Sequence, residues 1–322
     1  MRRFILNFLL FFLISTTIIL SLTIIVDSYI NKKANFKLSD NCKYLIIGSS
    51  HPEGAFNDSI IRNLHNFSKG GEAYFYTFFK LQKITEQNPK IKTVFLEFSN
   101  GQILDSNMNA WIWEEPLISN KYPTFSPFMN ISKKIFLFKH NYNGFTNSLS
   151  LSLFENTSRI IHSDYKFSMS PNVGGFSSLS RKMTDSEVEK SNIQNQILYY
   201  QKNQNKISNA HINCLEEIVR FCKEHEIKLY LIRSPLPKFF PIYGNEYAFQ
   251  KLKNEKFENI EYLDFSKFPL KTCEFGDLEH VNQDGAKIFS IWFNNLINLG
   301  LLNKPNKQEY INDKIKEIID LK

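Results

Sequence analysis

Apolar residues divide the chain into a long uncharged segment at the amino end and a body in which short apolar runs alternate with amphipathic stretches. Phe4–Val26 contains no charged side chain, and 17 of its 23 residues are apolar. A helix that rises about 1.5 Å per residue would make this segment roughly 34 Å long, enough to cross a hydrocarbon core of about 30 Å. The pattern predicts a transmembrane helix within residues 1–26.

The charges that flank this segment favour one orientation. Arg2 and Arg3 precede it, Asp27 follows it directly, and Lys32 and Lys33 come later. By the positive-inside rule, this order places the amino end in the cytoplasm. The sequence therefore predicts a single-pass membrane anchor, with the rest of the chain in the periplasm or outside the cell.

A cleaved signal peptide is the alternative to an anchor, because it has the same order of charges. The apolar region of a signal peptide is usually shorter and ends at small residues. Here the run ends in Leu22–Tyr29, which contains no Ala-x-Ala site. We therefore favour an uncleaved anchor, and cleavage stays open.

Four short apolar runs in the body predict buried strands: Tyr44–Ile47, Thr93–Phe98, Lys228–Ile232 and Ile260–Asp264. Between and after them, apolar spacing and capping residues predict helices: one starting at Asn57 or Asp58 with Ile60, Ile61 and Leu64 as its apolar positions, then Glu72–Gln87, Ile207–His225, Asp284–Leu299 and an exposed amphipathic tail over 306–322. Strands that alternate with helices imply an α/β fold whose mainly parallel sheet is covered on both faces. Its ligand crevice should lie at the carboxyl ends of the strands.

Residues 102–205 do not follow this alternation. The stretch is rich in Asn, Ser, Phe and Tyr, with turn signals at Pro116, Pro123, Pro127 and Gly174-Gly175. About a hundred residues is too long for a plain loop. We predict an inserted cap or irregular subdomain that shapes the substrate cleft, within a domain over residues 43–322.

Composition narrows the class of protein. The 322 residues are 43% hydrophobic and 22% charged, and they include 12 Gly, 11 Pro and 4 Cys, which excludes disordered, collagen-like and disulfide-scaffold chains. The net charge of +7 is scattered along the chain, so no nucleic-acid partner is predicted. Metal-binding His-x-x-x-His or Cys-x-x-Cys spacings and nucleotide-binding glycine motifs do not occur, so neither a metal nor a cofactor is predicted.

Two short segments contain residues suited to nucleophilic catalysis. Ser50 ends Gly48-Ser49-Ser50 directly after the first predicted strand, where a glycine-assisted turn can present its hydroxyl to the crevice. Asp277 stands three residues before His280, so it can accept the Nδ1 proton and leave Nε2 free as a general base. Each segment alone is also common in ordinary turns, and only their combination predicts a site.

Two further segments offer donors to an oxyanion. Gly70 and Gly71 precede the helix predicted from Glu72, and we favour Gly71 because it directly abuts that helix. Asn100 follows the strand predicted over Thr93–Phe98, and its side-chain amide can donate to the same oxygen. With a nucleophile, an oriented base and an oxyanion hole, the set meets the requirements for acyl transfer through a covalent ester.

The order and spacing of these four segments resemble the SGNH hydrolase superfamily, also called the GDSL esterase family, over roughly residues 43–100 and 206–299. The resemblance implies a three-layer α/β/α fold of flavodoxin-like type. It also implies a catalytic triad with a nucleophile, base and orienting acid at Ser50, His280 and Asp277, and oxyanion donors at Gly71 and Asn100.

The chain departs from the family pattern at two places. Ser49 stands where the family motif has Asp, and Phe98-Ser99-Asn100-Gly101 replaces the usual Gly-x-Asn-Asp. Such variants resemble membrane-anchored members linked to O-acyl modification of surface polysaccharides. The resemblance thus implies an esterase or O-acetyltransferase acting on acetyl esters of a surface carbohydrate, with a membrane-bound partner conceivable as acyl supplier. The alternative is a catalytically silent SGNH-fold protein with a binding or assembly role.

Overall fold

A five-stranded, all-parallel sheet forms the centre of the body in the computed structural model, which describes residues 1–203 and 206–320. The spatial order of its strands is β2-β1-β3-β4-β5. Their bounds are β1 Tyr44–Ile47, β2 Leu64–Asn66, β3 Thr93–Glu97, β4 Lys228–Arg233 and β5 Tyr262–Asp264. The predicted α/β class with a parallel sheet is confirmed.

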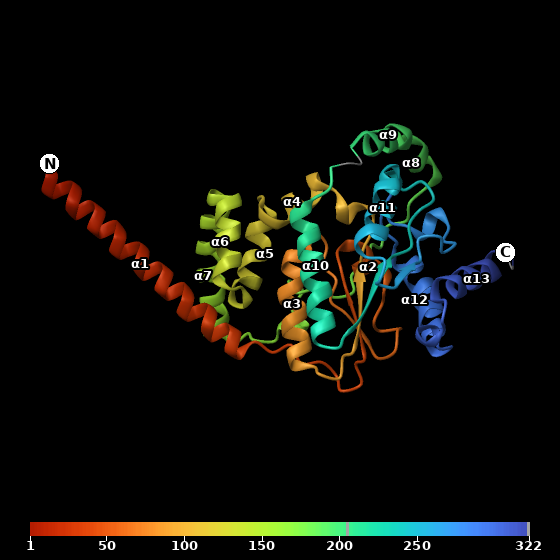
Figure 1. Ribbon diagram of the computed structural model, residues 1–322, viewed down its shortest axis with the longest axis horizontal. Coiled ribbons are helices and arrows are strands. Elements are labelled where there is room, and N and C mark those ends of the chain that lie inside the picture. Colours follow the sequence, from red (N-terminus) through yellow and green to blue (C-terminus); the bar gives the residue numbers. More distant parts are fainter. Residues whose placement is uncertain (204–205, 321–322) are drawn as a thin grey trace.

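Helices cover both faces of this sheet. Alternate side chains of a strand point to opposite faces, so Leu45 and Ile47 join the hydrophobic cluster formed with α3 and α10, whereas Ile46 joins the cluster formed with α12 and α13. Figure 1 shows α3 and α10 on one side of the strands and α12 and α13 on the other. The bounds are α3 Tyr74–Gln87, α10 Asn209–Glu224, α12 Gln283–Asn298 and α13 Lys307–Asp320.

The tail helix α13 is more deeply packed than predicted. It lies within the tail predicted over 306–322, of which residues 321–322 lie outside the described residues. Ile311 is fully buried and Ile315 nearly so, and both belong to the α12 cluster. The apolar stripe of the tail therefore completes one covering layer of the sheet.

The prediction of a helix that contains Ile60, Ile61 and Leu64 is wrong. Residues 58–63 form turns and a bend, and Leu64 begins the edge strand β2 instead. Asn63 adopts the left-handed conformation at φ 59°, which interrupts a right-handed helix before Leu64. The first helix of the body comes earlier, as α2 (Ser50–Ala55), directly after β1.

The region predicted as an insertion, residues 102–205, is mostly helical where it is described; its last two residues, 204 and 205, are outside the described part. In Figure 1, α4–α7 lie beside α3 and α10, whereas α8 and α9 lie near α11. The region thus contributes to two separate places on the body. The bounds are α4 Asp105–Trp113, α5 Leu117–Phe125, α6 Ile131–His140, α7 Tyr142–His162, α8 Asp185–Lys190, α9 Ile193–Asn203 and α11 Glu246–Lys256.

The amino end forms one long apolar helix, α1 (Arg2–Lys33), which extends away from the body in Figure 1. Its most apolar 18-residue window has a mean hydropathy of 2.6 and is almost entirely exposed. Length and composition of this kind are typical of a membrane span or of a signal sequence. Only its last turns join the body, where Asp27 accepts hydrogen bonds from Ser126 (3.1 Å) and Lys134 (2.5 Å).

Candidate active site

Ser50 lies where the chain leaves β1 and enters α2. Gly48 makes this sharp exit possible, because a Cβ added there would lie 2.5 Å from Cβ of Glu97 and 2.6 Å from Cγ of Pro52. Real Cβ atoms do not approach so closely, so a side chain at this position would push the strand end and the helix apart. The short turn brings Ser50 to the carboxyl end of the sheet, where the crevice was predicted.

Ser50, His280 and Asp277 form one continuous hydrogen-bonded series. The Ser50 hydroxyl lies 2.7 Å from Nε2 of His280, and Nδ1 of the same ring lies 3.0 Å from each carboxylate oxygen of Asp277. With the proton on Nδ1, the ring donates to Asp277 and accepts from Ser50. The structure therefore brings together three predicted residues that the sequence separates by up to 230 positions.

The turn before α12 holds the Asp277 carboxylate in place. Its Oδ1 also accepts the backbone N–H groups of Glu279 (2.8 Å) and His280 (2.7 Å). Just beyond, the Asn282 side chain caps α12 by accepting from the amides of Asp284 and Gly285, both at 3.1 Å. Because both ends of the turn are fixed, the imidazole is presented in one orientation.

The electrostatics of the pair suit proton transfer. Burial acts to raise the pKa of Asp277, but the hydrogen bond and charge of His280, together with the two backbone amides, lower it to about 2. Burial acts to lower the pKa of His280, but Asp277 outweighs it and holds that pKa above its usual value. The carboxylate thus stays ionised, and the imidazole is a stronger base than it would be alone.

Of the two candidate glycines, the structure places Gly70 closer to Ser50. A Cβ added to Gly70 would lie 3.7 Å from Cβ of Ser50, whereas one added to Gly71 would meet only Leu117. Gly71 takes the left-handed conformation, at φ +64°, that a glycine adopts readily. The Gly70 amide donates to Glu53 at 2.6 Å, so that donor is already used. The oxyanion role of Gly71 stays a prediction.

Asn100 lies in a different hydrogen-bond network. Its side chain is fully buried, and its amide nitrogen donates to Asn245 (3.1 Å) and Glu246 (2.6 Å). Its side-chain oxygen accepts from Arg233 at 2.8 Å. Because both amide hydrogens have partners, an oxyanion would receive one only if a bond in this network broke. The predicted oxyanion role of Asn100 therefore has no support from this geometry.

Sequence reasoning missed a buried carboxylate that binds both neighbours of Ser50 in the sequence. Glu97, the last residue of β3, is completely buried and accepts from the Ser49 amide (2.5 Å), the Ser49 hydroxyl (2.7 Å) and Nδ1 of His51 (3.1 Å). Burial acts to raise the pKa of Glu97, but these bonds and the His51 ring outweigh it and hold the pKa below its usual range. An acidic residue that ends a buried strand was the available signal.

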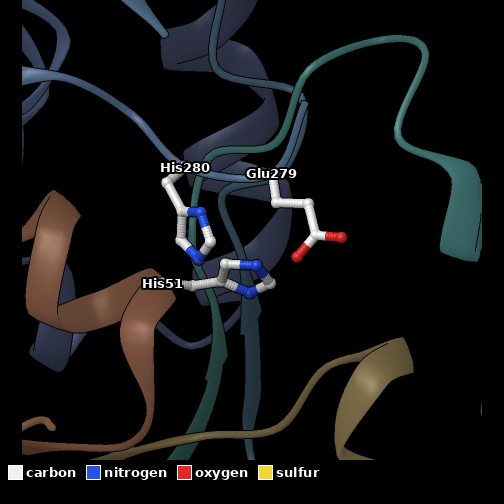
Figure 2. Close-up of side chains that lie close together, drawn as sticks. All are labelled: His51, Glu279 and His280. Atoms are coloured by element: carbon white, nitrogen blue, oxygen red, sulfur yellow. The ribbon is translucent and has the colours of Figure 1, made fainter. Parts of the chain in front are cut away.

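The side chains of His51, Glu279 and His280 converge on one space (Figure 2), each with one ligand-type atom within 4.8 Å of the other two. Two imidazoles and a carboxylate are a donor set that suits zinc. However, the His280 nitrogen that is not held by Asp277 is Nε2, and it lies 2.7 Å from the Ser50 hydroxyl. An ion bound to Nε2 would break that hydrogen bond. We therefore assign no metal to this group.

Comparison with known proteins returns no match to this chain, whether against protein-family models, curated proteins or solved structures. The established description is an α/β protein with a five-stranded parallel sheet and a long apolar helix at its amino end. A function must be argued from the site itself.

Proposed function

We propose that this chain is a serine-dependent acyl-ester hydrolase or O-acyltransferase of the SGNH type. The observation that carries the proposal is the hydrogen-bonded series of Ser50, His280 and Asp277. It lies beyond the carboxyl ends of parallel strands, where open α/β sheets bind their ligands. A hydroxyl, an imidazole and a carboxylate joined in this order are the arrangement by which serine hydrolases activate their nucleophile.

The geometry supports a two-stage reaction. Nε2 of His280 removes the Ser50 proton as Oγ attacks the ester carbonyl, while Asp277 orients the ring and stabilises the imidazolium. The backbone N–H of Ser50 lies in the first turn of α2, where amides have no partner within the helix, and can donate to the oxyanion. The alcohol then leaves as its oxygen takes up a proton. Water or a second hydroxyl attacks the acyl carbon and gives up its own proton, and the bond to Oγ breaks as Ser50 regains a proton.

The proposed substrate is an O-acetyl ester of a carbohydrate at the cell surface. This rests on the departures at Ser49 and at Phe98–Gly101, which resemble those of membrane-anchored SGNH members. In the structure, the Ser49 amide and hydroxyl both donate hydrogen bonds to the buried Glu97, so a serine at this position stabilises that carboxylate. A membrane-bound partner that supplies acyl groups fits the transferase form of the proposal.

The helix α1 supports a membrane-anchored form with a cytoplasmic amino end and the α/β domain outside the cytoplasm. Thr23, Asp27 and Ile30 of α1 are buried, and Asp27 pairs with Lys134 of α6. The last turns of the helix thus belong to the folded body. This packing favours retention of the helix over removal of a signal peptide.

One observation favours the alternative, a catalytically silent SGNH-fold protein with a binding or assembly role. One of the two predicted oxyanion donors is already used, since the Asn100 amide donates to Asn245 and Glu246. Without this donor, the triad would lack part of the stabilisation that a tetrahedral intermediate needs.

Covalent labelling separates the two functions. The full chain in detergent micelles is treated with a fluorophosphonate probe and, separately, with p-nitrophenyl acetate. We expect labelling and ester turnover that disappear in Ser50→Ala but persist in Ser59→Ala, which alters an exposed serine. Absence of labelling in the folded wild-type protein would contradict the catalytic function and support the binding or assembly role.

A further inference from the structure

A second imidazole–carboxylate pair lies beside the Ser50–His280–Asp277 series. His51 follows Ser50 in the first turn of α2, and its Nδ1 lies 3.1 Å from Oε1 of Glu97. The His51 ring centroid is 5.1 Å from that of His280. Two imidazoles, each paired with its own carboxylate, therefore lie next to each other, and one of them bonds to the Ser50 hydroxyl.

The carboxylate that holds His51 is itself immobile. Glu97 is fully buried, and in addition to His51 it receives the amide and hydroxyl of Ser49. Gln102 adds a longer contact at 3.4 Å. Phe240 packs against the His51 ring in a T-shaped contact, with the two centroids 5.7 Å apart. These contacts fix the plane of the His51 ring and direct its other nitrogen.

That other nitrogen, Nε2, is open. Among the described residues, no hydrogen bond is made to it, and Figure 2 shows this side of the ring facing the carboxylate of Glu279. His211 provides a contrast: its buried Nδ1 has no hydrogen-bond partner among the residues that the structure describes, and burial lowers the pKa of His211 to about 3. His51 combines one anchored nitrogen with one that faces the site, as an acid or base requires.

We propose that His51 is a second catalytic imidazole, which exchanges protons with the alcohol oxygen on the far side of the acyl carbon from Ser50. The inference rests on the proposed acyl-transfer function and extends it. In this proposal His280 exchanges protons only with the Ser50 oxygen, and His51 exchanges protons with the departing and the incoming alcohol. Glu97 is its positioning residue.

The proton balance closes over one cycle. At the start His51 carries a proton on Nε2 and His280 is neutral. The Ser50 proton passes to His280 as Oγ bonds to the acyl carbon, and the His51 proton passes to the leaving alcohol as its C–O bond breaks. The acyl-enzyme then holds a protonated His280 and a neutral His51.

The second half of the catalytic cycle, deacylation, reverses the two proton transfers. An acceptor hydroxyl gives its proton to Nε2 of His51 as its oxygen bonds to the acyl carbon. The bond from the acyl carbon to Oγ breaks, and Oγ takes back the proton held by His280. In this step the unprotonated Nε2 of His51 takes the proton of the acceptor. The carboxylate of Glu279 faces the same space and can bind a further hydroxyl of a sugar acceptor.

The test separates acylation from deacylation in the full chain. p-Nitrophenyl acetate has a leaving group that departs as an anion without an acid, so its acylation step does not need His51, and the proton on Nε2 of His51 passes to solvent before the acyl group is released. We expect His51→Gln to form acetyl-Ser50 at the wild-type rate and then to release it about 10²- to 10⁴-fold more slowly, the usual contribution of a general acid–base. Rapid-quench intact mass spectrometry would show the acetylated protein accumulating.

Three further variants serve as controls for the effect of His51→Gln. His280→Gln should lose acetylation itself, and His225→Gln, at an exposed helix end, should behave as the wild type. Glu97→Gln leaves a single oxygen acceptor, so its NH2 group faces either Nδ1 of His51 or the Ser49 amide; it should loosen the His51 ring and slow release alone, by less than His51→Gln does. If His51→Gln loses its near-UV circular dichroism, Glu97→Gln decides the question.

Two outcomes would overturn the inference while the proposed function survives: His51→Gln slows acetylation and release by the same factor, or it changes neither. If the folded wild-type protein never becomes acetylated at Ser50, the proposed function fails and the inference fails with it. Selective accumulation of the acetyl-enzyme in His51→Gln and Glu97→Gln would support both.

Discussion

Two polar clusters lie at the carboxyl ends of the parallel strands, and they differ in how completely their groups are paired. Around Arg233, at the end of β4, the guanidinium bonds to Asp264, Glu246 and Asn100, and its side chain is 5% exposed. Around Ser50, the series of hydrogen bonds ends at the Ser50 hydroxyl, and Nε2 of the next residue, His51, makes no hydrogen bond within the described part of the chain and faces Glu279 (Figure 2). One cluster is closed on itself and the other presents reactive atoms.

The comparison teaches that a polar side chain at the correct edge of the sheet is not sufficient evidence for a site. Asn100 and Ser50 both follow strands that run into the crevice. Asn100, however, has its donors and its acceptor used internally, whereas Ser50 has a base poised to remove its proton. Pairing, rather than position, separates structural from reactive groups.

The largest expected effect is in the open cluster. Asp277→Asn should lower turnover of an activated ester about 10⁴-fold, because the amide cannot stabilise the imidazolium and favours the wrong tautomer of His280. The free energy of unfolding should change little, since Asp277 is partly exposed. Stopped-flow ester hydrolysis and urea unfolding measure the two quantities. Near-normal turnover would contradict the assigned role.

In the closed cluster, the main effect should be on stability. Arg233→Met leaves the carboxylates of Asp264 and Glu246 without their cation, and breaking a buried pair in this way costs about 3–5 kcal/mol of unfolding free energy. Urea titration checks this value, with the exposed Arg220→Met as control. A loss below that of the control would show that the cluster is not structural.

Asn100 tests the boundary between the two clusters. Asn100→Ala should lower the unfolding free energy by about 1–3 kcal/mol, because buried partners lose their hydrogen bonds. Turnover per folded molecule should stay near that of the wild type. A fall in turnover of about 10²- to 10³-fold without destabilisation would instead identify Asn100 as an oxyanion donor.

The smallest effect concerns pH. His280 must be neutral to accept the Ser50 proton, and Asp277 holds the pKa of His280 above its ordinary value. Activity should therefore fall on the acidic side at a pH above about 6.5, the usual midpoint for histidine. In Asp277→Asn the residual activity should fall at a lower pH, since the charge that favours the imidazolium is gone. A profile of kcat/KM against pH measures both midpoints, and an unchanged midpoint in the variant would count against the pairing.

Much of the fold was readable from local patterns. The strand at Tyr44–Ile47 has the predicted bounds, α12 is displaced by one residue from Asp284–Leu299, and the uncharged run over Phe4–Val26 lies inside α1. Such elements depend on the spacing of apolar side chains and on caps within a few residues. The edge strand β2 did not follow from local pattern, since its three residues become a strand only by pairing with β1.

The candidate site likewise has features that follow from local sequence and features that depend on tertiary contacts. The sequence alone determined the residue types needed for acyl transfer and the strand-to-turn position of Ser50, because a glycine turn and an Asp-x-x-His spacing are local properties. Only the tertiary structure decided which of these groups meet, that Asn100 is tied to Arg233, and that Glu97 holds His51 beside the serine. The physical reason is that a hydrogen bond between distant residues depends on the packing of every element between them, which no short stretch of sequence contains.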